Sequence, residues 1–270
     1  MLLTTTIRNL EHIAIPSKIG IRQKGFLEKE LQSINHAIGE DLHRKLKLLF
    51  YRNNQHVSEH EFDLRLVELK RYFIMCSVLK DVPMFSEEVD EVWHTFILST
   101  RDYEKFCYDF MGEFLHHHPA TVRTPNPHGR AWFDLIYTQL FEFTEFTGLT
   151  WGAFYLNPLR KSLIEELKHA PEEELKSKYF RLGANEEVVD VLVTLLREEV
   201  KLAFDKGFSL EKHPFTSKEQ IHFLEQAPYF AQAMIFNSSY NNEEYLKRMY
   251  DVQIGSNDKS SVACGSGSVA

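Results

Sequence analysis

Apolar residues recur at helical spacing through most of the chain from Gly25 onward. After Ser86, which can cap a helix, Val89, Val92, Trp93, Phe96 and Ile97 follow the i, i+3, i+4, i+7, i+8 pattern of an amphipathic helix. The same spacing predicts helices over 26–39, 40–52, 58–80, 99–114, 132–148, 159–169, 171–180 and 186–206. We therefore predict an all-α fold, an irregular multi-helix bundle.

Residues that favour helix ends mark several boundaries. Ser58 and Glu61 have the spacing of a capping box ahead of an apolar run. Pro83 is expected to stop the helix that this run forms, and Gly148 to end the one that contains Trp132. On its helix Cys76 falls on the apolar side, which predicts a buried, structural thiol.

The chain divides into four predicted parts. Residues 1–23 form an arm, irregular or a short strand, and 24–120 a first helical domain; 121–254 form a second subdomain packed closely against it. Between the two, 119–129 contain three prolines and a glycine and predict a loop. A turn at 213–214, short helices to about 236 and a helix over 243–250 complete the second part. The Gly/Ser-rich stretch 255–270 predicts a disordered tail.

Charge and cysteine content narrow the function classes. The net charge of −8 argues against general binding of nucleic acid, which needs a basic surface. No apolar run approaches the ~20 residues that cross a bilayer, and the first residues lack the pattern of a signal peptide. Three cysteines are too few for a disulfide framework, which favours a reducing compartment. We expect a cytoplasmic protein without a membrane segment.

Candidate chemistry is concentrated between Val82 and Pro119. Asp90 and His94 are four residues apart, so they share one helix face. A carboxylate commonly orients the second nitrogen of a metal-binding imidazole, and Asp90 is spaced for that supporting role or for countering the helix dipole. In the alternative without a metal, His94 is hydrogen-bonded to Asp90 or Tyr103 and holds two helices in register.

The same segment offers further ligands for a metal. The predicted metal ligands are His94, Cys107, His116 and His117, a set that suits zinc or another borderline divalent metal. At most two of the consecutive histidines 116–118 could reach one ion. In the alternative, these histidines complement the dipole at a helix end, and Cys107 is buried on an apolar stripe.

Motifs for other chemistry are missing from the sequence. The chain has no CxxC, HExxH, P-loop, GxGxxG or GxSxG pattern. Nucleotide-dependent and serine-hydrolase reactions therefore have no support from the sequence. Whether the protein is an enzyme stays open.

The block around Trp93 resembles the tryptophan–histidine block of bacterial proteins of the glycine-rich-domain-containing (GRDP-like) family, over about residues 25–120. The matching positions are Val89, Asp90, Trp93, His94, Phe96, Thr100, Tyr103, Phe106, Cys107, His116, His117 and Pro119. Many relatives in that family end in a low-complexity tail, and its plant relatives are associated with stress and developmental signalling, which is too loose an association to carry over. The resemblance implies that these residues form either one functional site or one packed structural cluster. It does not imply any reaction.

Three functions follow as hypotheses. The first is a scaffold or adaptor that recognises another protein through a Trp-His-aromatic pocket; its residues are Asp90, Trp93, His94, Tyr103 and Phe106. The alternative is a metal-binding protein or metal-dependent enzyme, in which Tyr103 donates a proton or orients a bound water. The third is a toxin, effector or defence-type protein.

Overall fold

The computed structural model describes residues 9–22, 25–117, 125–206 and 227–240. Within these ranges the chain forms eleven α-helices and no β-strand, and only two isolated bridges join extended residues. The predicted all-α fold is confirmed. The predicted turn at 213–214, the helix over 243–250 and the tail over 255–270 lie outside the described residues.

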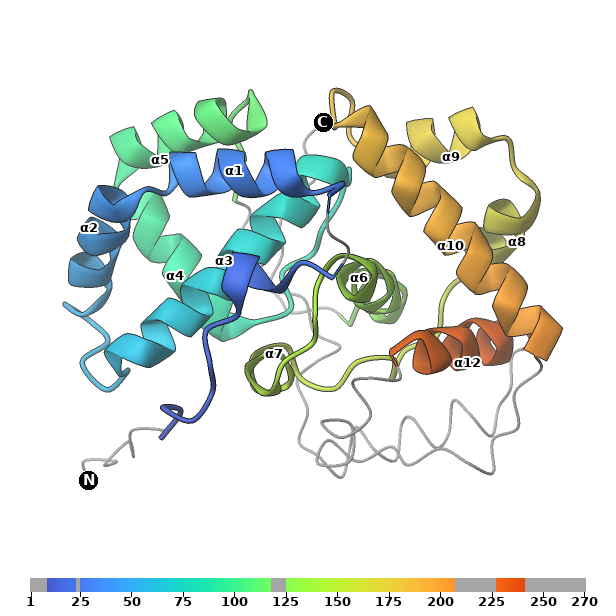
Figure 1. The fold of residues 1–270 in the computed structure, drawn as a ribbon, viewed down its shortest axis with the longest axis horizontal. Helices are drawn as coiled ribbons and strands as arrows, with labels where there is room; N and C mark the ends of the chain where they lie inside the picture. The colour runs from blue at the N-terminus through green and yellow to red at the C-terminus, as the bar shows by residue number, and fades with distance from the viewer. Residues whose placement is uncertain (1–8, 23–24, 118–124, 207–226, 241–270) are drawn as a thin grey trace.

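In the first half of the chain, helices surround a long central one (Figure 1). They are α1 (Glu28–Ala37), α2 (Glu40–Phe50), α3 (Glu59–Val78), α4 (Glu87–Leu98) and α5 (Thr100–Phe106). The central helix is α3, which buries residues on every side and so packs against neighbours all round. A π-helical turn (Cys107–Met111) extends α5 and ends at Gly112, whose φ of 77° suits glycine.

Two of the predicted helix caps are present. The hydroxyl of Ser58 accepts a hydrogen bond from the backbone N–H of Glu61 at 3.1 Å, and that of Ser86 accepts from the N–H of Val89 at 3.2 Å. The Glu61 carboxylate, however, accepts from Arg65 at 2.7 Å. The expected reciprocal capping box is therefore replaced by an ion pair within α3.

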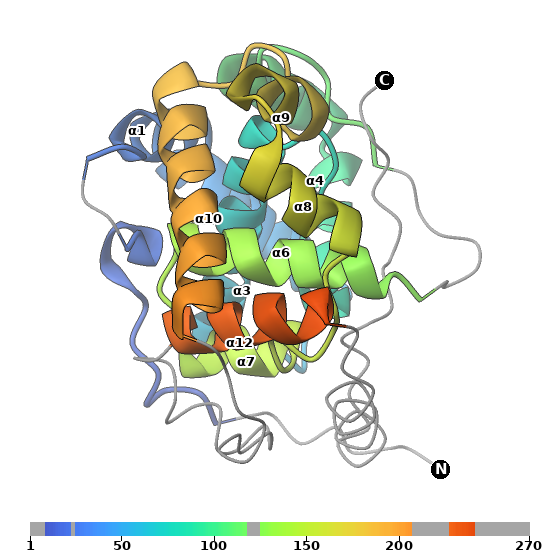
Figure 2. The same cartoon turned by 90° about the vertical axis from the view of Figure 1, so that its right-hand side faces the viewer.

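The second half adds six helices, seen face-on in Figure 2. They are α6 (Pro127–Leu140), α7 (Glu145–Trp151), α8 (Lys161–His169), α9 (Glu172–Tyr179), α10 (Glu186–Lys206) and α12 (Ala227–Ser239). The single helix predicted over 132–148 was wrong, because α6 ends at Leu140. Thr144 and Thr147 form a capping box that begins α7, a signal that the apolar Phe143 obscured. The loop predicted over 119–129 also ends early, since Asn126 caps α6.

One hydrophobic cluster joins the two halves. It includes Ile34 and Phe73 from the first half together with Tyr137, Leu192 and Ile235 from the second. Trp151 of α7 also bridges the halves, because its indole N–H donates to Glu68 of α3 at 2.8 Å. The predicted subdomains therefore share their core.

The N-terminal arm is attached to this core. Its described part contains a short 3₁₀ turn (Ser17–Gly20) and a bridge from Ile21 to Phe141, so the predicted strand is a single bridge. Arg71 of α3 donates to the carbonyl of Ile19 at 2.8 Å. A Cβ on Gly20, whose φ is 65°, would lie 2.3 Å from Nη2 of Arg71, which explains the glycine there. None of the described helices is both long and apolar enough to span a bilayer.

Candidate metal centre

Asp90 and His94 lie one turn apart on α4, as their spacing predicted. Their nearest atoms are Oδ2 of Asp90 and Nε2 of His94, 3.6 Å apart. This distance is too long for a hydrogen bond, so the pair is held by the helix rather than by a direct bond. Ser86 caps the N-terminus of α4 and so holds the first turn of the helix, which contains Asp90.

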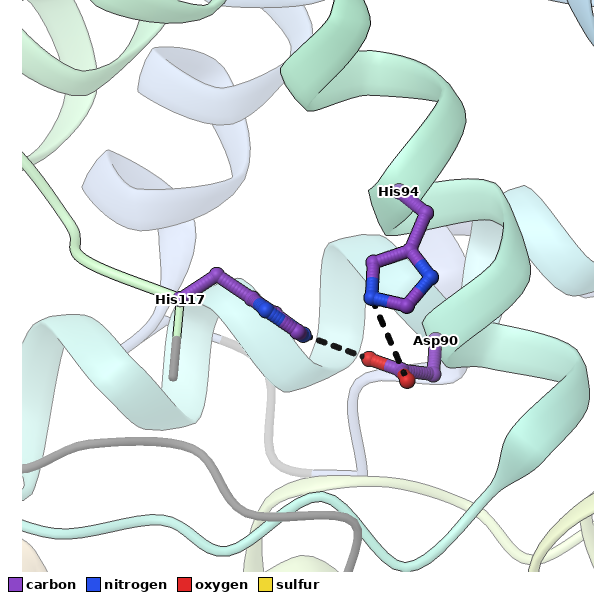
Figure 3. Close-up of side chains that lie close together, drawn as sticks. All are labelled: Asp90, His94 and His117. Atoms are coloured by element: carbon purple, nitrogen blue, oxygen red, sulfur yellow. Dashed lines mark hydrogen bonds and ion pairs between the residues drawn. The ribbon is translucent and has the colours of Figure 1, made fainter. Parts of the chain in front are cut away.

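His117 reaches the same carboxylate from a separate segment. Its Nε2 lies 2.8 Å from Oδ1 of Asp90, within hydrogen-bond distance. Figure 3 shows both imidazoles directed at this carboxylate, one from α4 and one from the chain that follows Gly112. The rings of His94 and His117 meet nearly edge to face, with centroids 4.6 Å apart.

Three potential donor atoms converge at this point. One each from Asp90, His94 and His117, they all lie within 4.8 Å of one another. Cis ligands of an ion with bonds near ~2.1 Å are about 3 Å apart, so a small closure would complete the set. The side chain of His117 is 7% exposed and that of Asp90 12%, whereas that of His94 is 51% exposed. The centre is therefore anchored on its buried side and open to solvent on the other.

Buried aromatic side chains position His117. The indole N–H of Trp93 donates to the hydroxyl of Tyr103 at 3.0 Å, and this hydroxyl donates to the carbonyl of Leu115 at 2.7 Å. The ring of Trp93 also meets that of His117 edge to face, with centroids 4.4 Å apart. Two contacts thus fix the segment that carries the second imidazole.

The predicted aromatic binding residues serve the core rather than a pocket. Trp93, Tyr103 and Phe106 are 0, 2 and 1% exposed. Burial raises the pKa of Tyr103 well above its ordinary value, with the neighbouring Cys107 adding to the shift. A phenol held neutral in this way is a fixed hydrogen-bond partner. A partner would reach these three rings only by opening the core.

Two of the predicted metal ligands lie away from the three-donor group. Cys107 is fully buried, and its thiol contacts Tyr103 and the backbone of Leu115. Burial raises the pKa of this thiol against the opposing effect of those hydrogen bonds, which disfavours the thiolate that a metal needs. His116 is exposed and its ring packs against Phe114, with centroids 4.9 Å apart. His118 lies outside the described residues.

The structure gives the carboxylate of Asp90 a second imidazole partner, His117. This carboxylate was expected to support His94 from behind, yet its two oxygens face two different imidazoles. The carboxylate therefore lies beside both imidazoles as a third potential donor. The sequence carried no signal for this, because the contact with His117 spans 27 positions and two segments.

Comparison with known proteins gives one match. Residues 31–141 match the model of a family described as UCP032817-like, a stretch that holds Asp90, His94 and His117 but less than half of the chain. The comparisons with curated proteins and with solved structures gave no match.

This match overturns the resemblance drawn from the sequence. The block around Trp93 matches the UCP032817-like family and not a GRDP-like one. Trp93 and Cys107 of this block are fully buried, and residues buried for packing do not by themselves identify a family.

Proposed function

We propose that this protein binds one divalent transition-metal ion through Asp90, His94 and His117. The observation that carries the proposal is the convergence of these three donors, from two separate segments, within 4.8 Å. The carboxylate of Asp90 faces both imidazoles at once, through Oδ2 toward His94 and Oδ1 toward His117.

The donor types define the class of metal. Two imidazole nitrogens and one carboxylate oxygen suit borderline ions such as Zn²⁺, Fe²⁺ or Co²⁺, and this combination occurs both in catalytic zinc sites and in non-haem iron sites. An ionised carboxylate only accepts hydrogen bonds, so the short contact of Asp90 with His117 requires a proton on Nε2. A bound metal would replace that proton.

Three protein donors favour a reactive centre over a purely structural one. Structural zinc is held by four protein ligands, while catalytic zinc keeps a position for water or substrate. The half-exposed ring of His94 puts such a position on the solvent side. We therefore propose a metal-dependent enzyme, in the reducing cytoplasm that the cysteine content favours. Tyr103 has no part in that chemistry, since it is buried and bonded to Trp93 and Leu115.

Elemental analysis of untagged protein tests the proposal. Purified protein, stripped with chelator and dialysed against Zn²⁺ or Fe²⁺, is expected to bind about one equivalent. His117→Ala and Asp90→Asn should each lose the bound metal. Uptake below about 0.1 equivalent by the wild-type chain would refute it.

The chain supplies a matched control pair. Glu165 and His169 on α8 repeat the four-residue spacing, with Nε2 and Oε2 3.7 Å apart, on an exposed face. His169→Ala removes the imidazole of this carboxylate–imidazole pair and should leave metal uptake unchanged. Equal losses in His169→Ala and His94→Ala would show nonspecific surface binding instead.

A further inference from the structure

A cavity that is separate from the candidate metal centre lies where α6, α8 and α9 meet. It encloses about 290 Å³ and is lined by residues of these helices and of the segment that follows α3. Figure 2 shows α8 lying between α6 and α9 on this face of the molecule. The volume is at the lower end of the range for small-molecule sites. None of the three metal-centre residues lines it.

The charge of the lining is mostly positive. Lys80, Arg160 and Lys178 line the cavity together with one carboxylate, that of Asp81. Both oxygens of Glu166 already hold Lys178 at 2.7 Å, so its charge is compensated. The ammonium group of Lys80 donates to the carbonyl of Ser177, which is neutral, and has no carboxylate partner among the described residues.

Among these three basic residues, Arg160 is best suited to bind an anion. It is exposed and lines the cavity, and it forms no ion pair within the described part of the chain. Its guanidinium presents a planar fork of donors that matches the oxygens of phosphate. Together with Lys80 it supplies two positive charges, and a phosphate monoester carries close to two negative ones.

Two aromatic side chains line the same cavity. Trp132 of α6 and Tyr179 of α9 both line it, with ring centroids 5.5 Å apart. The hydroxyl of Tyr179 donates to Glu166 at 2.5 Å, which fixes this ring. Trp132 is only partly buried, in contrast to Trp93 and Trp151, so part of its indole can receive a planar group.

We propose that this cavity binds a small phosphate ester that carries a planar ring, with Arg160 and Lys80 holding the phosphate and Trp132 packing against the ring. His128 also lines the cavity. Its Nδ1 donates to the carbonyl of Pro158 at 2.8 Å, which leaves Nε2 as an acceptor in the neutral imidazole. Asp81 adds the one carboxylate of this lining.

Calorimetric titration with phenyl phosphate, inorganic phosphate and phenol tests each part. Phenyl phosphate is expected to bind in a 1:1 ratio with a Kd below about 1 mM, more tightly than either fragment. Arg160→Glu should weaken its binding at least about 10-fold, since a charge-assisted bond becomes a repulsion. Trp132→Ala should reduce the affinity for phenyl phosphate to that for inorganic phosphate.

Two controls separate this site from charge alone and from the metal centre. Arg44→Glu on α2 makes the same charge change at an exposed position and should not alter binding. Titrations are run in chelator and repeated with His117→Ala, in which phenyl phosphate should still bind. Loss of binding in His117→Ala, unchanged affinity in Arg160→Glu, or no binding of phenyl phosphate to the wild-type chain at about 5 mM would each overturn the inference.

Discussion

Two carboxylates on neighbouring helices, Glu68 of α3 and Asp90 of α4, have opposite surroundings. Both oxygens of Glu68 are occupied by protein donors, which are Arg71 at 2.9 Å, Thr147 at 3.0 Å, Tyr137 at 2.6 Å and Trp151 at 2.8 Å. Among the residues that the structure describes, the side chain of Asp90 meets two imidazoles, and one of them is half exposed. Glu68 is 2% exposed, so its interactions are sealed from water.

The difference lies in the chemistry of the partners. Guanidinium, indole, phenol and hydroxyl groups keep their protons at neutral pH, and burial raises the pKa of Tyr137 well above its ordinary value despite the opposing charge of Arg71. These groups can only donate hydrogen bonds to the carboxylate. A neutral imidazole also has a lone pair for a metal. The Glu68 cluster therefore stabilises the fold, and the Asp90 cluster is suited to binding.

The largest expected effect comes from breaking the Glu68 cluster. Arg71→Met leaves a buried carboxylate without its counter-charge and should lower the free energy of unfolding by about 3–5 kcal/mol. Urea unfolding followed by circular dichroism measures the loss. Lys105→Met, which removes one partner of the exposed pair with Asp109, is the control and should cost less than about 1 kcal/mol. A similarly small loss of unfolding free energy in Arg71→Met would contradict the claim that the Glu68 cluster stabilises the fold.

The second effect is specific to the Asp90 cluster. Zn²⁺ at 100 times its Kd should raise the free energy of unfolding by about 2.7 kcal/mol in the wild-type chain, because metal binds the folded state. His117→Ala should lose this gain, while Arg71→Met should keep it under conditions where it is folded. An equal gain in His117→Ala would place the metal elsewhere.

A third variant tests the connection between core and site. Tyr103→Phe removes the bond to Leu115 and leaves the indole N–H of Trp93 without its acceptor, at a cost of about 1–3 kcal/mol. Since the same bond positions the segment before His117, zinc affinity should fall about 10-fold. Tyr108→Phe, at an exposed position, is the control. Unchanged zinc affinity in a destabilised Tyr103→Phe would mean that the segment is held by other contacts.

The smallest expected effect of metal is on the thiols. Burial raises the pKa of Cys76 to about 12 and also raises that of Cys107, so little thiolate forms at pH 8. In a Cys264→Ser chain, both thiols should react with a disulfide reagent at least about 100-fold more slowly than in urea. Added Zn²⁺ should not change this rate. Protection by Zn²⁺ would return Cys107 to the ligand set.

Local signals predicted much of the fold and only part of the site. Ser58 and Ser86 cap helices as expected, because such caps depend on neighbouring residues alone. The spacing of Asp90 and His94 is local in the same way. The π-helical turn at 107–111 and the positive φ of Gly112 change the direction of the chain before His117. Helical periodicity could not show which of the adjacent histidines faces α4.

Long-range contacts account for what the sequence did not predict. The cluster of Glu68 with Tyr137 and Trp151 joins positions 69 and 83 residues apart, and the cavity at Arg160 needs three helices in place. No pattern within one helix encodes either. Helical spacing placed Trp93 on an apolar face, but its contacts with Tyr103 and His117 depend on packing between elements.

Anomalous X-ray diffraction at the zinc edge, from crystals of zinc-loaded protein, tests the central claim most directly. The account predicts one strong peak between α4 and the segment after Gly112. It should lie about 2.0–2.2 Å from Nε2 of His94, Nε2 of His117 and a carboxylate oxygen of Asp90. A peak at Cys107 or on an exposed pair such as Glu165–His169, with none beside Asp90, would contradict it.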